Sequence, residues 1–463
     1  MGYSTLKAAL DAVVKTNGRQ EITGSNLNGV MTSILQGVDI LDRANPADTS
    51  GLNHVVLKKN LTFAEQVTGT NTIYEIRDSF NLGGGSVVIP DGCLLKFNGG
   101  KLTNGGLSGN KFLVDSDSCC FSGITFLSDY VGVIHSRWFV HTDKLSKQNA
   151  LVDCSTYLQD WVNCGSRNLY LDAGLYYVGS TITINRKVCI DGDGNMLTPR
   201  QEWPENYWDQ SAIIFTDQEI PVVNFVIGND GYKAFNIKNV GFANINKTPS
   251  VDTIPILKFD LTNAGLWGLD FSPCIYGSVD GSTFNHIGYQ FNVYGTTFFA
   301  LCHYGGKLDK LNIGYEFNKD AGATGFNNVS TFDVTATNVN MLINAPDFLN
   351  YATIRGMMQM NVNNNTFNNN KAFCEINGPV VWEADAADYG GSGTTWTARY
   401  LVRASRKITY KNAPAYAFVR NDGAPVYYND AGDGDKSVNV IQTNSLLYLL
   451  KLDHRAHLSF PCQ

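Results

Sequence analysis

Short runs of alternating apolar and polar residues recur along most of this chain, and many of them end at a glycine or an asparagine. The segments 72–76, 86–92 and 93–100 are examples, and similar runs continue from about 222 to 377. Such alternation over four to eight residues indicates β-strands that bury one face. Corresponding runs lie roughly 20 to 30 residues apart, a spacing that is typical of the coils of a solenoid.

The composition agrees with many short strands joined by tight turns. The chain has 463 residues, with 45 glycines, 12% aromatic residues and only 17% charged residues. That length exceeds the size of a typical compact domain. A solenoid is not restricted to that size, because each layer buries its apolar face on its neighbours. Few charges and many glycines and aromatics favour β-structure over helix.

We therefore predict an all-β fold, a right-handed parallel β-helix in which each coil adds one strand to each of about three sheets. A short helical segment should precede it, and a β-rich cap should close its C-terminal end. A helix at 150–162 is expected to cap the other end of the main stack. The predicted segments are 1–48 (helical), 52–136 (leading coils), 137–412 (main β-helix with its cap helix) and 413–463 (C-terminal cap).

The helical segment carries an apolar seam whose positions are spaced by four and three residues. This a/d spacing is typical of a helix that packs against another helix. Two readings stay open, an amphipathic helix lying on its own chain or a short trimeric bundle. The candidate oligomerisation residues are Leu27, Met31, Ile34, Val38 and Leu41.

Charge and cysteine content exclude several classes of protein. The net charge of −7 without a basic cluster makes the chain a poor nucleic-acid binder. The 10 cysteines are irregularly spaced without a C-x-x-C pair, so we expect free thiols in the core rather than a zinc site or a disulfide framework. We predict no metal and no cofactor. The sequence shows no signal peptide and no apolar run long enough for a membrane span.

Carboxylates on the predicted strands are the first candidate site. Outward residues on successive coils of a β-helix line one groove, and two such carboxylates can act as acid and base on a glycosidic bond. A lyase would instead use a Lys, Tyr or His base, and ordinary solvated strand faces are the simpler alternative. The candidate catalytic residues are Asp260, Asp270, Asp280, Glu316 and Asp333.

Two aromatic and acidic clusters interrupt the strand pattern. Flat aromatic faces stack on sugar rings, and neighbouring carboxylates accept hydrogen bonds from hydroxyls. Such loops can equally pack their tryptophans on the side of the solenoid. The candidate glycan-binding residues are Trp203, Glu205, Tyr207, Trp208 and Asp209 in the first cluster and Trp382, Glu383 and Trp396 in the second.

Three passages together resemble the pectate-lyase-like β-helix superfamily and its phage tailspike branch. They are Trp138-Phe139 with the helix around Leu158-Gln159-Asp160-Trp161, then Leu169-Tyr170-Leu171-Asp172-Ala173-Gly174-Leu175-Tyr176-Tyr177-Val178, and finally Thr181-Ile182-Thr183-Ile184 leading to Ile190-Asp191-Gly192-Asp193-Gly194. In the family these form a helix cap, a hairpin and the first coil. The segment 14–25 also looks like the opening of tail proteins of gut phages.

The resemblance implies a phage tail spike or fibre component that binds host surface polysaccharide during attachment. The alternative is a depolymerase spike, a hydrolase or lyase that cleaves capsule or lipopolysaccharide; a free bacterial lyase or hydrolase is a third hypothesis. Whether the chain is an enzyme stays open. The resemblance further implies a homotrimer that docks on a tail or baseplate protein through residues 1–48. It also implies a place in the virion tail, after synthesis in the host cytoplasm and release by lysis.

Overall fold

The structure is a computed structural model in which the chain divides into two compact units. The first unit runs to Thr142 and includes Asn163–Ser166, and the second comprises Asp143–Val162 and the chain from Arg167 onward. The described residues are 52–109, 111–127, 130, 132–147, 150–194, 212–228, 232–233, 236–250, 254–277, 279–280, 283–295, 298–319, 326–327, 330–345, 352–360, 372–376, 380–382, 385–388, 400–404, 408–411, 427–429 and 438–441.

The first unit consists of short parallel strands. One sheet has the order β1-β2-β5-β7, and in a second sheet β6 pairs with β3, β4 and β8. Gly83 and Gly84 turn the chain between β3 and β4 with φ of 67° and 78°, a conformation that favours glycine. The elements are β1 Asn53–Val56, α3 Phe63–Gln66, β2 Thr72–Ile76, β3 Ser79–Asn81, β4 Ser86–Val88, β5 Cys93–Phe97, β6 Lys101–Ser108, β7 Phe112–Asp115, β8 Phe121–Phe126, β9 Ile134–His135 and η1 Ser136–Trp138.

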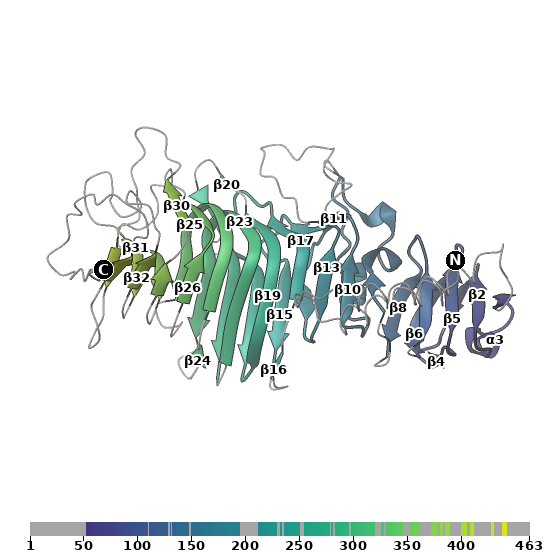
Figure 1. Ribbon diagram of the computed structural model, residues 1–463. Coiled ribbons are helices and arrows are strands. Elements are labelled where there is room, and N and C mark those ends of the chain that lie inside the picture. Colours follow the sequence, from purple (N-terminus) through teal and green to yellow (C-terminus); the bar gives the residue numbers. More distant parts are fainter. Residues whose placement is uncertain are drawn as a thin grey trace, which may run out of the picture. The chain divides into compact units, whose positions relative to one another are not determined.

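The second unit is a large assembly of parallel strands (Figure 1). With the first unit, it confirms the predicted all-β class. Its elements, after η2 Thr142–Lys144, are α4 Ser155–Val162, β10 Asn168–Leu171, β11 Gly174–Tyr177, β12 Ile182–Ile184, β13 Cys189–Gly192, β14 Ala212–Thr216, β15 Val223–Ile227, β16 Tyr232–Lys233, β17 Asn236–Asn244, β18 Ile254–Thr262, β19 Gly265–Tyr276, β20 Val279–Asp280, β21 Thr283–Phe284, β22 His286–Tyr294, β23 Phe298–Lys319, β24 Phe326–Asn327, β25 Ser330–Ala345, β26 Ala352–Arg355, β27 Met357–Met360, β28 Ala372–Ile376, β29 Val380–Trp382, β30 Asp385–Asp388, β31 Tyr400–Ala404, β32 Ile408–Lys411, β33 Tyr427–Asn429 and β34 Val438–Ile441.

The strands of the second unit pair in three parallel ladders, each named here after its first strand. The chain visits the ladders in turn, through β10, β11 and β12 and then β13, β14 and β15, while the long strands β23 and β25 each contribute to all three. The β10 ladder runs β10-β13-β17-β19-β23-β25-β26-β29-β32-β34. The β11 ladder runs β11-β14-β17-β19-β23-β25-β27-β30. The β12 ladder runs β12-β15-β18-β22-β23-β25-β28-β31-β33.

The helix expected at 150–162 is present but shorter, because α4 begins at Ser155. The Asp153 carboxylate accepts a hydrogen bond from the Ser155 backbone N–H at 2.9 Å, which satisfies one donor at the helix start. At the other side of the helix, the Gln159 side chain meets the backbone of Thr183 in β12. Its Nε2 donates to the Thr183 carbonyl at 2.9 Å, and its Oε1 accepts from the Thr183 N–H at 2.9 Å. The amide therefore occupies the backbone groups that a neighbouring strand would use.

A column of stacked phenylalanine rings fills the interior along the β12 ladder. Phe225 and Phe259 have ring centroids 4.5 Å apart, and Phe259 and Phe291 have theirs 4.7 Å apart. Phe317 extends the column, 4.9 Å from Phe291. The four rings are in register across β15, β18, β22 and β23 and are all buried. Because strand spacing is about 4.8 Å, identical positions on paired strands stack face to face.

A second buried group combines aromatic rings with polar atoms. Tyr289 and Tyr315 stack with centroids 5.0 Å apart, and the His303 ring lies edge-on to both. The Tyr315 hydroxyl lies 3.1 Å from His303 Nδ1. Burial lowers the pKa of His303 to about 3 and raises the pKa values of both tyrosines well above their ordinary range. The imidazole is therefore neutral at ordinary pH.

Eight of the ten cysteines are seen as free thiols, as predicted. Seven of them are buried and Cys189 is half-buried. Burial raises the pKa of Cys154 to about 12, so its thiol acts as a small apolar core group rather than a nucleophile.

Candidate functional site

A row of polar side chains crosses the outward face of the β12 ladder, opposite the phenylalanine column. In β18 the exposure alternates, with Phe259 buried and its neighbours Lys258 and Asp260 partly exposed. β22 repeats the same pattern around Phe291. Because side chains alternate between the two faces of a strand, stacking phenylalanines inside places their polar neighbours in one row outside. We call this row the polar ladder; its members are Asn224, Lys258, Asp260, Gln290, Asn292, Glu316 and Asn318.

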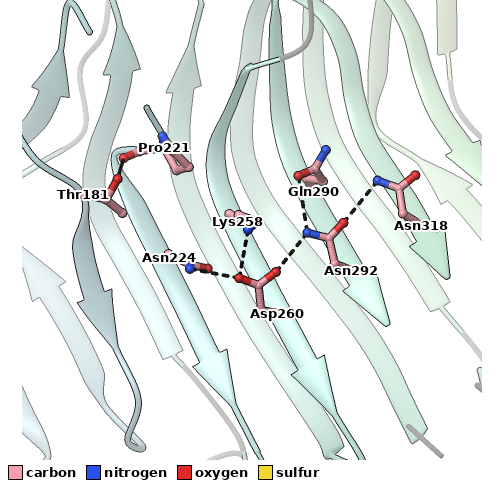
Figure 2. Close-up of polar contacts among 8 residues, drawn as sticks. All are labelled: Thr181, Pro221, Asn224, Lys258, Asp260, Gln290, Asn292 and Asn318. Carbon is pink, nitrogen blue, oxygen red and sulfur yellow. Dashed lines mark hydrogen bonds and ion pairs between the residues drawn. The ribbon is translucent and has the colours of Figure 1, made fainter. Parts of the chain in front are cut away.

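Asp260 is the centre of the polar ladder (Figure 2). Its Oδ2 accepts from Asn224 Nδ2 and pairs with Lys258 Nζ, both at 3.0 Å. Its Oδ1 accepts from Asn292 Nδ2 at 3.0 Å. Partial burial acts to raise the pKa of this carboxyl group. The hydrogen bonds from Asn292, Lys258 and Asn224 outweigh that effect, so the pKa of Asp260 lies below its ordinary value. Asp260 is therefore an anion held by three donors from three strands.

The other half of the polar ladder is built around Glu316. Its Oε2 accepts from Gln290 Nε2 at 2.7 Å and from Asn318 Nδ2 at 3.3 Å. Asn318 Nδ2 also donates to Asn292 Oδ1 at 3.2 Å, and Asn292 Nδ2 also donates to Gln290 Oε1 at 3.5 Å. Asn292 thus joins the two halves, and one hydrogen-bonded network spans β15, β18, β22 and β23 (Figure 2).

The polar ladder suits binding of a polyhydroxylated ligand better than it suits metal binding. Carboxylates and amides offer acceptors and donors close together, which matches hydroxyl groups that both donate and accept. Among the residues that the structure describes, no group of three or more His, Cys, Asp or Glu side chains is arranged to hold a metal ion.

The predicted catalytic carboxylates do not share one surface. Asp260 and Glu316 both lie in the polar ladder. Asp270 in β19 and Asp333 in β25 lie instead on the β10 ladder. Asp280 lies in the antiparallel pair of β20 and β21. The five candidates therefore belong to different ladders, because the chain passes through three ladders within one coil, and Asp260 and Glu316 are the two that share one.

The two carboxylates that remain together are widely spaced. β22 lies between β18 and β23, so the backbones at Asp260 and Glu316 are roughly 10 Å apart across the sheet. Glu316 is also displaced by two register positions, which adds roughly 7 Å along the strands. A retaining glycosidase needs carboxyl groups about 5 Å apart, so this pair does not fit that mechanism.

Most of the remaining predicted site residues lie outside the described part of the chain. Trp203, Glu205, Tyr207, Trp208 and Asp209 lie outside the described residues, as do Glu383 and Trp396. Trp382 is the last residue of β29. The predicted oligomerisation residues Leu27, Met31, Ile34, Val38 and Leu41 also lie outside the described residues.

Most members of the polar ladder were not predicted from the sequence, in which only carboxylates on strands and two aromatic and acidic clusters indicated a site. The missed members are the amides and the lysine: Asn224, Lys258, Gln290, Asn292 and Asn318. A signal was present, because a phenylalanine preceded by a polar residue occurs in all four strands. In β22 and β23 the match extends to Ile-Gly-Tyr-x-Phe-Asn, beginning at Ile287 and Ile313, and the structure pairs these two segments in register.

Comparisons of this chain with protein-family models, curated proteins and solved structures found no match. In the described part of the chain, no helix is both long and apolar enough to cross a membrane. The function proposed below therefore rests on the residues of the chain itself.

Proposed function

We propose that the second unit is a right-handed parallel β-helix and that it belongs to a phage tail spike or fibre that binds host surface polysaccharide. The order of strand pairing supports the solenoid, because each passage through the three ladders adds one strand to each. Crossovers between parallel strands are right-handed in nearly all proteins, which supports the hand. In this arrangement α4 closes the start of the β12 ladder, since Gln159 occupies the backbone groups of Thr183.

The polar ladder is the observation that carries the binding role. It crosses four paired strands without a break and combines amides, carboxylates and one ammonium group. Adjacent strands are about 4.8 Å apart, a distance of the order of one sugar ring. An extended glycan that lies across the strands would therefore meet a new pair of polar groups at each sugar.

The role in a phage tail is supported by the sequence resemblance of the passages at 138–194 and of the segment 14–25. On this proposal residues 1–48 dock on a tail or baseplate protein, and the chain reaches its site in the virion after lysis of the host. A tail component of this kind would attach to a surface glycan, and on this proposal the polar ladder is the surface that binds it.

Substitution of Asn292 tests the proposed binding site. Asn292 connects both halves of the network, so Asn292→Leu, which removes the amide but keeps a side chain of similar size, should break the polar ladder. We expect the affinity for glycans bound on an array of bacterial surface polysaccharides to fall about tenfold or more. Asn53→Leu, the same change on the exposed strand β1, should leave binding unchanged. Equal binding by both variants would place the glycan elsewhere.

A depolymerase is the second candidate, because two carboxylates share the polar ladder. Asp260 has a lowered pKa and would serve as base, and Glu316 is the second carboxyl group that a cleavage reaction would use. Incubation of bound polysaccharide with the protein, followed by assay for new reducing ends and for unsaturated uronate, separates the two candidates. New chain ends that disappear in Glu316→Gln would establish cleavage. Tight binding without product would exclude the depolymerase.

The proposed homotrimer is a separate prediction. Seam residues such as Leu27 and Met31 are expected to hold three copies together, because a/d residues pack between helices. Light scattering at micromolar concentration should give three times the chain mass of 50.8 kDa. Polar substitution at Met31 and Ile34 should reduce that mass to one chain. A monomeric mass for the unaltered protein would refute the trimer.

A further inference from the structure

Most hydrogen-bond donors of the polar ladder are already bonded to acceptors within the polar ladder. Both N–H groups of Asn292 are engaged, with Asp260 and Gln290, and Asn318 Nδ2 donates to both Asn292 and Glu316. Within the described residues, Glu316 Oε1 and the side-chain oxygen of Asn318 have no hydrogen-bond partner. Asn318 is exposed and Glu316 is partly exposed, so the β23 end of the polar ladder presents free acceptors to solvent.

Lys258, which lies one strand in from the opposite end, presents donors, but its positive charge is already compensated. Lys258 Nζ lies 3.0 Å from Asp260 Oδ2, and the two side chains are 29% and 20% exposed. This pairing leaves spare N–H groups on the ammonium without a net charge. Among the members of the polar ladder, Lys258 is paired with Asp260, and Glu316 has no ion-pair partner within the described residues. Because Glu316 meets solvent, a like charge brought beside it would be repelled.

We propose that the polar ladder selects uncharged or amino-bearing glycans and rejects acidic ones. This inference rests on the proposed glycan-binding function. Glu316 and Asn318 accept hydrogen bonds from sugar hydroxyls or from a protonated amine, while Lys258 donates to ring or hydroxyl oxygens. A uronate, sialate or phosphate group is negatively charged and would be repelled by the carboxylate of Glu316. The polar ladder has no uncompensated cation that could pair with it.

The test sorts an array of bacterial glycans into uncharged, amino-bearing and acidic sets and measures binding by the full chain. We expect uncharged and amino-bearing glycans to bind, and acidic glycans of the same backbone to bind at least about tenfold more weakly, the effect of one unfavourable charge contact. Glu316→Gln keeps the shape of the side chain and removes its charge. It should weaken the amino-bearing set about tenfold, change the uncharged set by less than about twofold and improve the acidic set.

The possible outcomes distinguish failure of this inference from failure of the proposed glycan-binding function. Glu65→Gln, which neutralises an exposed carboxylate in α3, serves as the matched control and should change no set. Acidic glycans binding as well as the others would overturn the inference and leave the proposed function standing. An array on which nothing binds would remove both. Binding of all three sets that is indifferent to Glu316→Gln would show that glycans bind outside the polar ladder, which also overturns the inference.

Discussion

Phe259→Ala is expected to lower the free energy of unfolding of the second unit by about 3–5 kcal/mol, the usual cost of truncating a buried phenylalanine. The ring of Phe259 is fully buried and stacks on Phe225 and on Phe291. Its removal leaves a cavity between two rings that are fixed by their own strands, so the gap cannot close readily. Urea denaturation followed by tryptophan fluorescence or circular dichroism measures the change.

Val226→Ala is the matched control, because Val226 lies in the same ladder but on its outward face. Its side chain is 40% exposed, and a surface truncation of this kind usually changes stability by less than about 0.5 kcal/mol. If the two variants lost similar stability, the phenylalanine column would not be the core of this sheet.

Lowering the pH from 6.5 to 4.5 is expected to destabilise the second unit by about 2–3 kcal/mol through His303, since one pKa unit corresponds to about 1.36 kcal/mol. Burial lowers the pKa of His303 to about 3 in the folded protein, while the unfolded chain has a value near 6.5. Below pH 6.5 the unfolded chain therefore binds a proton that the folded protein does not. The stabilisation is complete above pH 6.5 and is lost as the pH falls toward 3.

The pH effect can be assigned by substitution. His303→Gln removes the titrating group but keeps a side chain that can hydrogen-bond with Tyr315, so the fall in melting temperature between pH 6.5 and 4.5 should become shallower. His286 contributes in the same direction, because burial also lowers its pKa, and some slope should persist. An unaltered slope in His303→Gln would contradict the assignment to this residue.

Much of the fold was predictable because the chain repeats one simple pattern. Alternation such as that around Phe259 and Phe291 indicates a strand regardless of its neighbours, and the structure places both in parallel ladders. Local detail was harder to predict. The helix α3 was missed although Thr62 and Glu65 form a capping box, because four residues are too few for a helical period to show. The predicted start of α4 is too early, because apolar spacing does not show where Asp153 accepts a hydrogen bond from the Ser155 N–H and ends the preceding loop.

The candidate site was only partly predictable, and the reason is register. A sequence shows that Asp260, Asp270 and Glu316 all lie on strands, but not which strands pair. Long strands such as β23 and β25 carry positions of all three ladders, so nearness in sequence misleads about sharing a face. The amides of the polar ladder were harder to predict, because a single asparagine in a strand does not indicate a site. Their recurrence beside a phenylalanine on successive strands was the signal in the sequence.

The in-register match of Ile287 with Ile313 has a consequence for how such a chain can change length. The segments that begin there share Ile-Gly-Tyr-x-Phe-Asn, so the side chains of this segment on β22 have the same or a similar residue at the paired positions on β23. Insertion or removal of the stretch from one isoleucine to the next would add or subtract one strand in every ladder and leave the joining sequence intact. The number of strands in the three ladders can therefore change by whole repeats through unequal copying, with the same residues packed at the joint.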